Sequence, residues 1–185
     1  MSAYQGHMLL HNQAALSNAL RRVWVDYISW TTALIYTILF GTHDQSAIEA
    51  RLKQNAQDYA NIFAQFYGDE VGTQLSALFE QYQAEITHLI QSHKDQDLTG
   101  VASHRQALYA IADQVALMLS RLNPYWDQAS IQIGLYEITN LYEEEIVHIL
   151  QQAFGESIEA YDELLAQSYR ISDELLFGLQ QQFRL

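Results

Sequence analysis

The sequence predicts an all-α protein that folds as an up-and-down antiparallel bundle of about six helices. Apolar residues recur every three or four positions through most of the chain, which is the spacing of one face of an α-helix. No segment shows the strict alternation that marks a half-buried strand. One proline and eight glycines in 185 residues leave long stretches without helix breakers. No linker separates these stretches, so we expect one domain over residues 1–185.

The first three helices are bounded by turn residues. Gly41 follows the first and Gly68 follows the second, and glycine commonly ends a helix. Asp44 or Ser46 can cap the second helix, and Asp69 can cap the third. The predicted helices cover about residues 13–40, 45–67 and 69–93.

The first helix is apolar on nearly every side, through Trp24, Trp30, Ile35 and Phe40 among others. We therefore expect it to be central in the bundle or covered by a partner chain. Its uncharged run, residues 27–40, is shorter than a bilayer requires and is diluted by hydroxyl residues. No membrane span is expected.

The last three helices follow a polar loop at residues 94–99. Asn123 and Pro124 separate the fourth helix from the fifth, because proline interrupts a helix and the residue before it avoids the α conformation. Gly155 is expected to end the fifth helix. The fourth helix should run from the loop to residue 122, and the others over 127–154 and 156–183. On the sixth helix, apolar spacing assigns to the core Ile158, Tyr161, Leu165, Leu175 and Leu179.

Charge and composition exclude several classes of function. With 9 basic and 22 acidic residues the net charge is −13, whereas nucleic acids and anionic membranes attract a basic face. The absence of cysteine excludes disulfides and thiol chemistry. Residues 1–20 lack the basic and apolar regions of a signal peptide, so we expect a cytoplasmic protein. The glycine-rich loops of nucleotide-binding proteins are also absent, and no catalytic residue can be assigned.

Two Glu-x-x-His motifs, Glu85 with His88 and Glu145 with His148, lie in near-identical surroundings. Residues three apart share a helix face, and in ferritin-like metal proteins each of two helices supplies one such pair. In a helical projection only Glu145 clearly faces the core. Glu85 and His148 flank the apolar stripes of their helices, and His88 points outward. A di-metal site requires all four to face inward, so the projection counts against it.

His104 is a further candidate ligand, because it projects from the apolar face of the fourth helix. Folding the chain at Asn123 and Pro124 brings His104 to nearly the height of Glu145. A buried carboxylate is costly without a partner, so we predict that Glu145 contacts His104 directly or through water. The favoured interpretation is a structural ion pair or hydrogen bond, and the alternative is a metal or ligand site. Glu143 and Glu144 are expected to be solvated.

Inward-facing polar residues predict a polar layer near the middle of the bundle. Antiparallel folding places Tyr27, Asn55 and Tyr82 at similar heights. Such a layer could bind an ordered water cluster or a small ligand or cofactor. Structural hydrogen bonds within a large core are the alternative that we favour.

Several short motifs are spread over most of the chain: Leu-Arg-Arg-Val-Trp at 20–24, Tyr-Gly-Asp-Glu-Val-Gly at 67–72 and Asn-Pro-Tyr-Trp at 123–126. Together they resemble a family of uncharacterised bacterial all-helical proteins. The resemblance implies a helical bundle and no established activity. It also implies histidines in relatives at the positions of Tyr27, Tyr82 and Ile138, and hence a metal or cofactor site there. This chain lacks those ligands, so the tyrosine layer would be a remnant of that site.

Two functions remain open. The first, which we favour, is a non-catalytic binding or interaction protein with a polar, tyrosine-rich core layer, forming a homo-oligomer through the first helix or its tyrosine-rich faces. The second is a ferritin-like metal protein that uses Glu85, His88, His104, Glu145 and His148. A small ligand or a divalent metal is the expected partner, and the cofactor is unknown.

Overall fold

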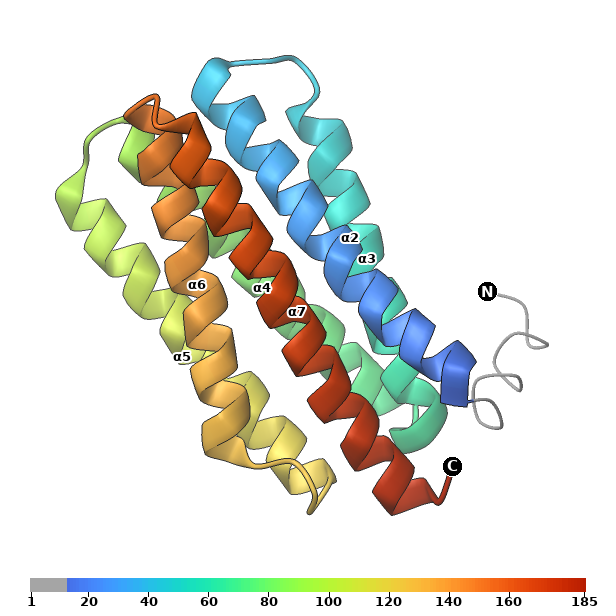
Figure 1. Cartoon of the computed structure of the whole chain (residues 1–185). Helices are drawn as coiled ribbons and strands as arrows, with labels where there is room; N and C mark the ends of the chain where they lie inside the picture. Colours follow the sequence, from blue (N-terminus) through green and yellow to red (C-terminus); the bar gives the residue numbers. More distant parts are fainter. Residues whose placement is uncertain (1–12) are drawn as a thin grey trace.

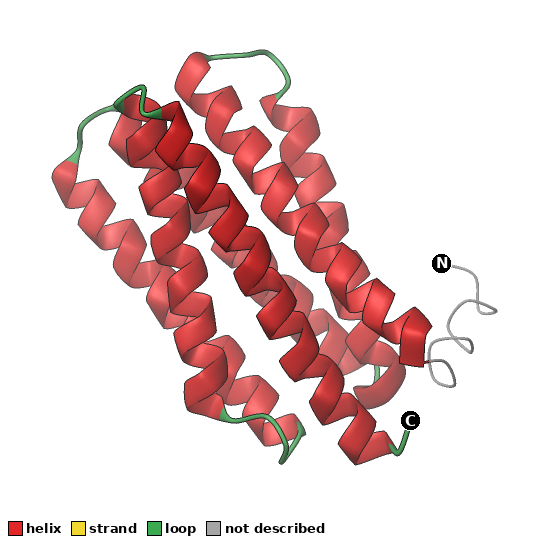
Figure 2. Cartoon of the chain, in the orientation of Figure 1, coloured by secondary structure: helices red, strands yellow, loops and turns green. Residues whose placement is uncertain are grey.

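The computed structural model describes residues 13–185, and over this range it is entirely helical apart from turns and loops (Figure 2). Most of the segment tested for a signal peptide, residues 1–12, lies outside this range. The helices are α2 (Gln13–Phe40), α3 (Gln45–Tyr67), α4 (Asp69–Lys94), α5 (Leu98–Leu122), α6 (Gln128–Leu150) and α7 (Phe154–Phe183). The predicted all-α bundle is confirmed, and the bounds of α2 and α3 agree with the prediction.

The six helices form three antiparallel hairpins, each made of two consecutive helices (Figure 1). The first members, α2, α4 and α6, contact one another and form the inside of the bundle. The second members lie outside and each packs against two inner helices: α3 against α2 and α4, α5 against α4 and α6, and α7 against α6 and α2. Core side chains of α2, α4 and α6 therefore meet one another in the interior of the bundle.

The boundary between α6 and α7 differs from the prediction. α6 ends at Leu150 and α7 already begins at Phe154, so Gly155 lies in the first turn of α7. The chain leaves α6 through Gln152, which takes the left-handed conformation at φ 60° that was expected of a glycine. At the earlier boundary, Gly68 adopts φ 89° directly before α4, and Asp69 lies in the first turn, where its charge suits the helix dipole.

Ile158, which was assigned to the core, is 60% exposed. The buried face at this end of α7 instead consists of the small residues Ser157 and Ala160. Small side chains allow α7 to approach its neighbours closely, and Ile158 lies about 100° around the helix from Ser157. The bulkier residues Leu175 and Leu179 are fully buried, as predicted.

α2 is one of the inner helices, as its apolar sequence predicted, and it contacts α3, α4, α6 and α7. By length and composition it could cross a bilayer, but half of its most apolar stretch is packed inside the bundle. Trp30 and Phe40 are nevertheless exposed on its surface.

The turn between α5 and α6 is anchored by Trp126, whose indole is buried and donates to the backbone oxygen of Leu175 at 3.2 Å. Gly178 provides the space for this ring, because a Cβ atom at that position would lie 2.0 Å from Trp126 Nε1. Asp127 then caps α6 by accepting a hydrogen bond from the Ser130 amide at 2.8 Å. These contacts join the α5–α6 turn to α7.

Candidate metal site

A cluster of Glu85, His88 and His104 forms where α4 meets α5. Glu85 and His88 lie one turn apart on α4, and His104 reaches them from α5. The two helices are joined by a short turn, which brings the end of α4 and the start of α5 to the same height. Among residues 13–185, this is the one group of three or more histidine, aspartate or glutamate side chains that is arranged to hold a metal ion.

The three side chains are already close to a common centre. His104 Nδ1 and Glu85 Oε2 are 2.7 Å apart, and the ring centroids of His88 and His104 are 5.1 Å apart. One ligand atom from each residue lies within 4.8 Å of the other two. Glu85 and His104 are half-buried, and His88 is exposed, as the helical projection indicated. Two imidazoles and a carboxylate form a donor set that suits zinc and related divalent ions.

Glu145 and His104 do not make the direct contact that was predicted as one alternative. Glu145 is 1% exposed, as expected, but its partner is Thr32 on α2, which donates to Oε2 at 3.1 Å. His104 bonds Glu85 instead. Glu145 faces the inner helix α2, whereas His104 faces α4. Burial raises the pKa of Glu145 to about 7, despite the opposing effect of the Thr32 hydrogen bond.

His148 lies apart from the other four predicted metal ligands. It is half-buried in the groove between α6 and α7, beside Glu144, Glu156 and Glu159. The second Glu-x-x-His motif therefore points its two side chains at different neighbours, α2 and α7. Of the five predicted ligands, the structure brings together Glu85, His88 and His104.

A second polar cluster surrounds Glu143, which was expected to be solvated. This side chain is only 15% exposed. His93 Nε2 lies 3.1 Å from one carboxylate oxygen, and Arg105 Nε donates to the other at 2.6 Å. Burial alone would raise the pKa of Glu143, but the hydrogen bonds and charges of His93 and Arg105 lower it to about 2. The cluster links α4, α5 and α6. The acidic run 143–145 gave no signal that its first member would be paired.

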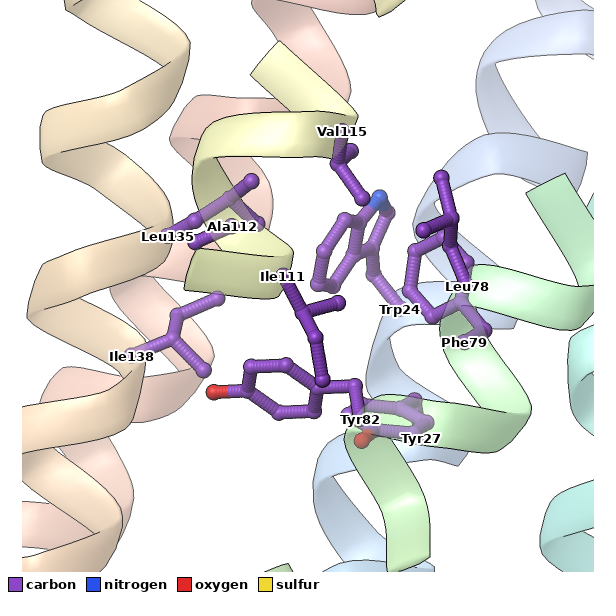
Figure 3. A pocket seen from close by; sticks show the side chains of 10 residues that line it. All are labelled: Trp24, Tyr27, Leu78, Phe79, Tyr82, Ile111, Ala112, Val115, Leu135 and Ile138. Carbon is purple, nitrogen blue, oxygen red and sulfur yellow. The ribbon is translucent and has the colours of Figure 1, made fainter. Parts of the chain in front are cut away.

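Tyr27 and Tyr82 meet in the interior, as predicted, with ring centroids 6.4 Å apart. They line a cavity of about 20 Å³, and Ile138 of α6 extends toward them (Figure 3). The three positions at which the resemblance implies histidines in relatives thus converge on one space between the inner helices. The space has room for about one water molecule, and its exposed walls are apolar.

Asn55 does not join the tyrosines. Its Nδ2 donates to the backbone oxygen of Val23 at 2.9 Å and so fixes α3 to α2. Tyr82 instead pairs with Thr139 of α6, with the two hydroxyls 2.7 Å apart. The hydroxyls of Tyr27, Thr31 and Tyr142 are buried and lack a well-formed hydrogen bond within the described range. The Thr31 hydroxyl is nevertheless close enough to lower the pKa of Tyr27 and of Tyr142. Burial has the larger effect and raises the pKa of both tyrosines.

Comparisons with protein-family models, with curated proteins and with solved structures find no match. The class of protein is therefore defined by the structure alone: over residues 13–185, it is an all-α bundle of six helices with a surface cluster of two histidines and a glutamate. The resemblance to a family of bacterial helical proteins stays a prediction.

Proposed function

We propose that this protein is a non-catalytic binding protein that holds one divalent metal ion at Glu85, His88 and His104. The observation that supports the proposal most directly is the convergence of one ligand atom from each residue to within 4.8 Å. His88 is exposed, and the cluster lies on the outside of the bundle, so an ion can reach it from solvent. Water would complete the coordination.

A metal would have to replace the hydrogen bond between Glu85 and His104. Ligands around a tetrahedral zinc ion lie about 3.4 Å apart, given bonds of about 2.0–2.1 Å. The 2.7 Å separation of Glu85 and His104 must therefore widen, and the longer separations must shorten. Changes of this size need only side-chain rotation, because the carboxylate and both rings are at the surface. Imidazole binds metal in its neutral form, so affinity should fall in acid.

The alternative, a ferritin-like site with two Glu-x-x-His motifs, requires Glu145 and His148 to join the cluster. Glu145 is bonded to Thr32 in the core, and His148 lies in the groove between α6 and α7. Both would have to leave these positions, and their helix, α6, would have to rotate. The geometry therefore supports a single-ion site better than a di-metal site.

The experiment is a titration of tag-free, chelator-treated protein with Zn²⁺ by calorimetry, and with Co²⁺ by visible absorption. The expected stoichiometry is one ion per chain. His104→Ala and His88→Ala should each weaken binding at least about tenfold, since each removes one of three ligands. His148→Ala is the matched control, because it removes the histidine of the other motif, and it should bind as the unmodified protein does.

Equal binding by His104→Ala and the unmodified protein would refute the proposal. An equal loss in His148→Ala would instead favour a site that uses both motifs. Circular dichroism of each variant checks that the bundle is intact, and His88, being exposed, can be replaced without disturbing the core.

A further inference from the structure

The surface between α6 and α7 carries a long groove that is remote from the candidate metal site. It consists of two adjoining hollows with volumes of about 570 and 470 Å³, which share Leu141, Glu144 and Glu163. Along α6 the groove extends from Ser130 to His148, which corresponds to about 27 Å of helix. Its length thus matches a helix of about 18 residues.

The groove combines an apolar base with acidic sides. Ile133, which is 57% exposed, and the half-buried Leu141 supply apolar surface. Seven of the chain's 22 acidic residues line the two hollows: Glu137, Glu144, Glu156, Glu159, Asp162, Glu163 and Glu174. Arg170 is the one Lys or Arg among the lining residues described, and its guanidinium lies 3.9 Å from Glu163. The groove therefore has a strong excess of negative charge.

A second copy of this chain is a poor match for the charge of the groove, because its own net charge is −13. Six of its nine Lys and Arg side chains already form ion pairs with its own acids. The remaining three, Lys94, Arg121 and Arg184, lie on three different helices or their ends rather than on one face. The occupant that fits the charge must come from another, basic molecule.

We propose that the α6–α7 groove binds a basic amphipathic helix of a partner protein. An amphipathic helix in a groove places apolar side chains on the base and polar ones along the edges. Here the apolar side chains would cover Ile133 and Leu141, and lysines or arginines would face the glutamates on both sides. Charges at the edges contribute mainly to the rate and selectivity of association, and the apolar base contributes to the lifetime of the complex. The proposal does not depend on metal binding.

The probe is a synthetic, dye-labelled helical peptide of about 18 residues, with leucine on one face and lysine on the other. Its binding to the full chain is measured by fluorescence anisotropy at low and at physiological salt. The double variant Glu144→Lys and Glu163→Lys should weaken binding by about tenfold or more. Asp58→Lys with Glu70→Lys is the matched control, because it makes the same change in net charge on α3 and α4, and it should have a much smaller effect.

Ile133→Ser tests the apolar base and should also weaken binding, whereas a glycine–lysine peptide of equal charge should bind more weakly than the leucine–lysine peptide. Chemical-shift changes of the isotope-labelled, unmodified protein locate the contact without any substitution. They are expected on α6 and α7. Equal losses in the two double variants, or shifts centred on other helices, would show that the peptide senses only net charge and would overturn the proposal.

Discussion

Thr32 of α2 donates a hydrogen bond to the buried carboxylate of Glu145 on α6, at 3.1 Å. Burial raises the pKa of this carboxyl to about 7, from an ordinary value of about 4.3. Between these pH values the folded chain holds a proton that the unfolded chain has lost. The free energy of unfolding therefore falls as pH rises from about 4.3 to 7, as far as this group is concerned.

Replacing this acid by its amide should remove that pH dependence. Glu145→Gln keeps an oxygen for Thr32 and cannot ionise, so its stability relative to the unmodified protein should increase with pH. The difference should be small below about pH 4 and reach roughly 3 kcal/mol above pH 7. Urea unfolding at a series of pH values measures it. A difference that does not change with pH would contradict the assignment.

Two buried tyrosines should respond oppositely to loss of the hydroxyl. The Tyr59 hydroxyl has no hydrogen-bond partner within residues 13–185, and its burial raises its pKa strongly. Tyr59→Phe should therefore leave stability unchanged or raise it by about 1 kcal/mol. The Tyr82 hydroxyl donates to Thr139, whose own hydrogen is used for the Leu135 oxygen at 3.0 Å. Tyr82→Phe should cost about 1 kcal/mol, and chemical denaturation compares the two.

A methyl group added at Gly178 should disturb the Trp126 anchor. The new Cβ would lie 2.0 Å from the indole nitrogen, so the ring must move and weaken its bond to Leu175. Gly178→Ala should lower the free energy of unfolding by roughly 1–3 kcal/mol. Gly155→Ala is the control on the same helix, because nothing lies within 4 Å of its added Cβ. A melting temperature lowered equally in both variants would contradict the packing argument.

The Glu143 cluster should stabilise the bundle at neutral pH and lose this effect in strong acid. His93 and Arg105 lower the pKa of the Glu143 carboxyl to about 2. The contribution of Glu143 to the free energy of unfolding is therefore complete above about pH 4.3 and disappears as the pH falls through 2. Glu143→Gln should cost roughly 1–3 kcal/mol at pH 7. Glu144→Gln, at the exposed neighbour, should cost much less. The free energies of unfolding of the two variants should converge as the pH is lowered.

The helices were predictable because their ends are set locally. Gly41 and Gly68 both adopt positive φ at the ends of α2 and α3, which is the conformation glycine permits. Gln152 performs the same role after α6 without being glycine, and the predicted boundary there was displaced accordingly. Glutamine, unlike glycine or asparagine, has no preference for that conformation, so the local sequence carried no signal at Gln152.

The three residues of the candidate site were among the five ligands named from the sequence, but Glu145 and His148 do not join them and the partner of His104 was predicted wrongly. Periodicity placed Glu145 in the core and His88 at the surface, because each placement depends only on the position of the residue around the axis of its own helix. The partner of His104 depends on which neighbour its helix face meets, and α5 packs against both α4 and α6. Glu143 was missed for the same reason, since His93 and Arg105 reach it from two other helices.

The contact of α2 with α7 joins the first described helix to the last, and Arg21 pairs with Asp173 across it at 2.7 Å. During synthesis the other contacts of α2 can form as successive hairpins emerge from the ribosome. The side that meets α7 stays open to water until α7 has been made. Nascent chains that lack α7 would expose an unusually apolar surface of α2. They are the form of this protein that should depend most on chaperones.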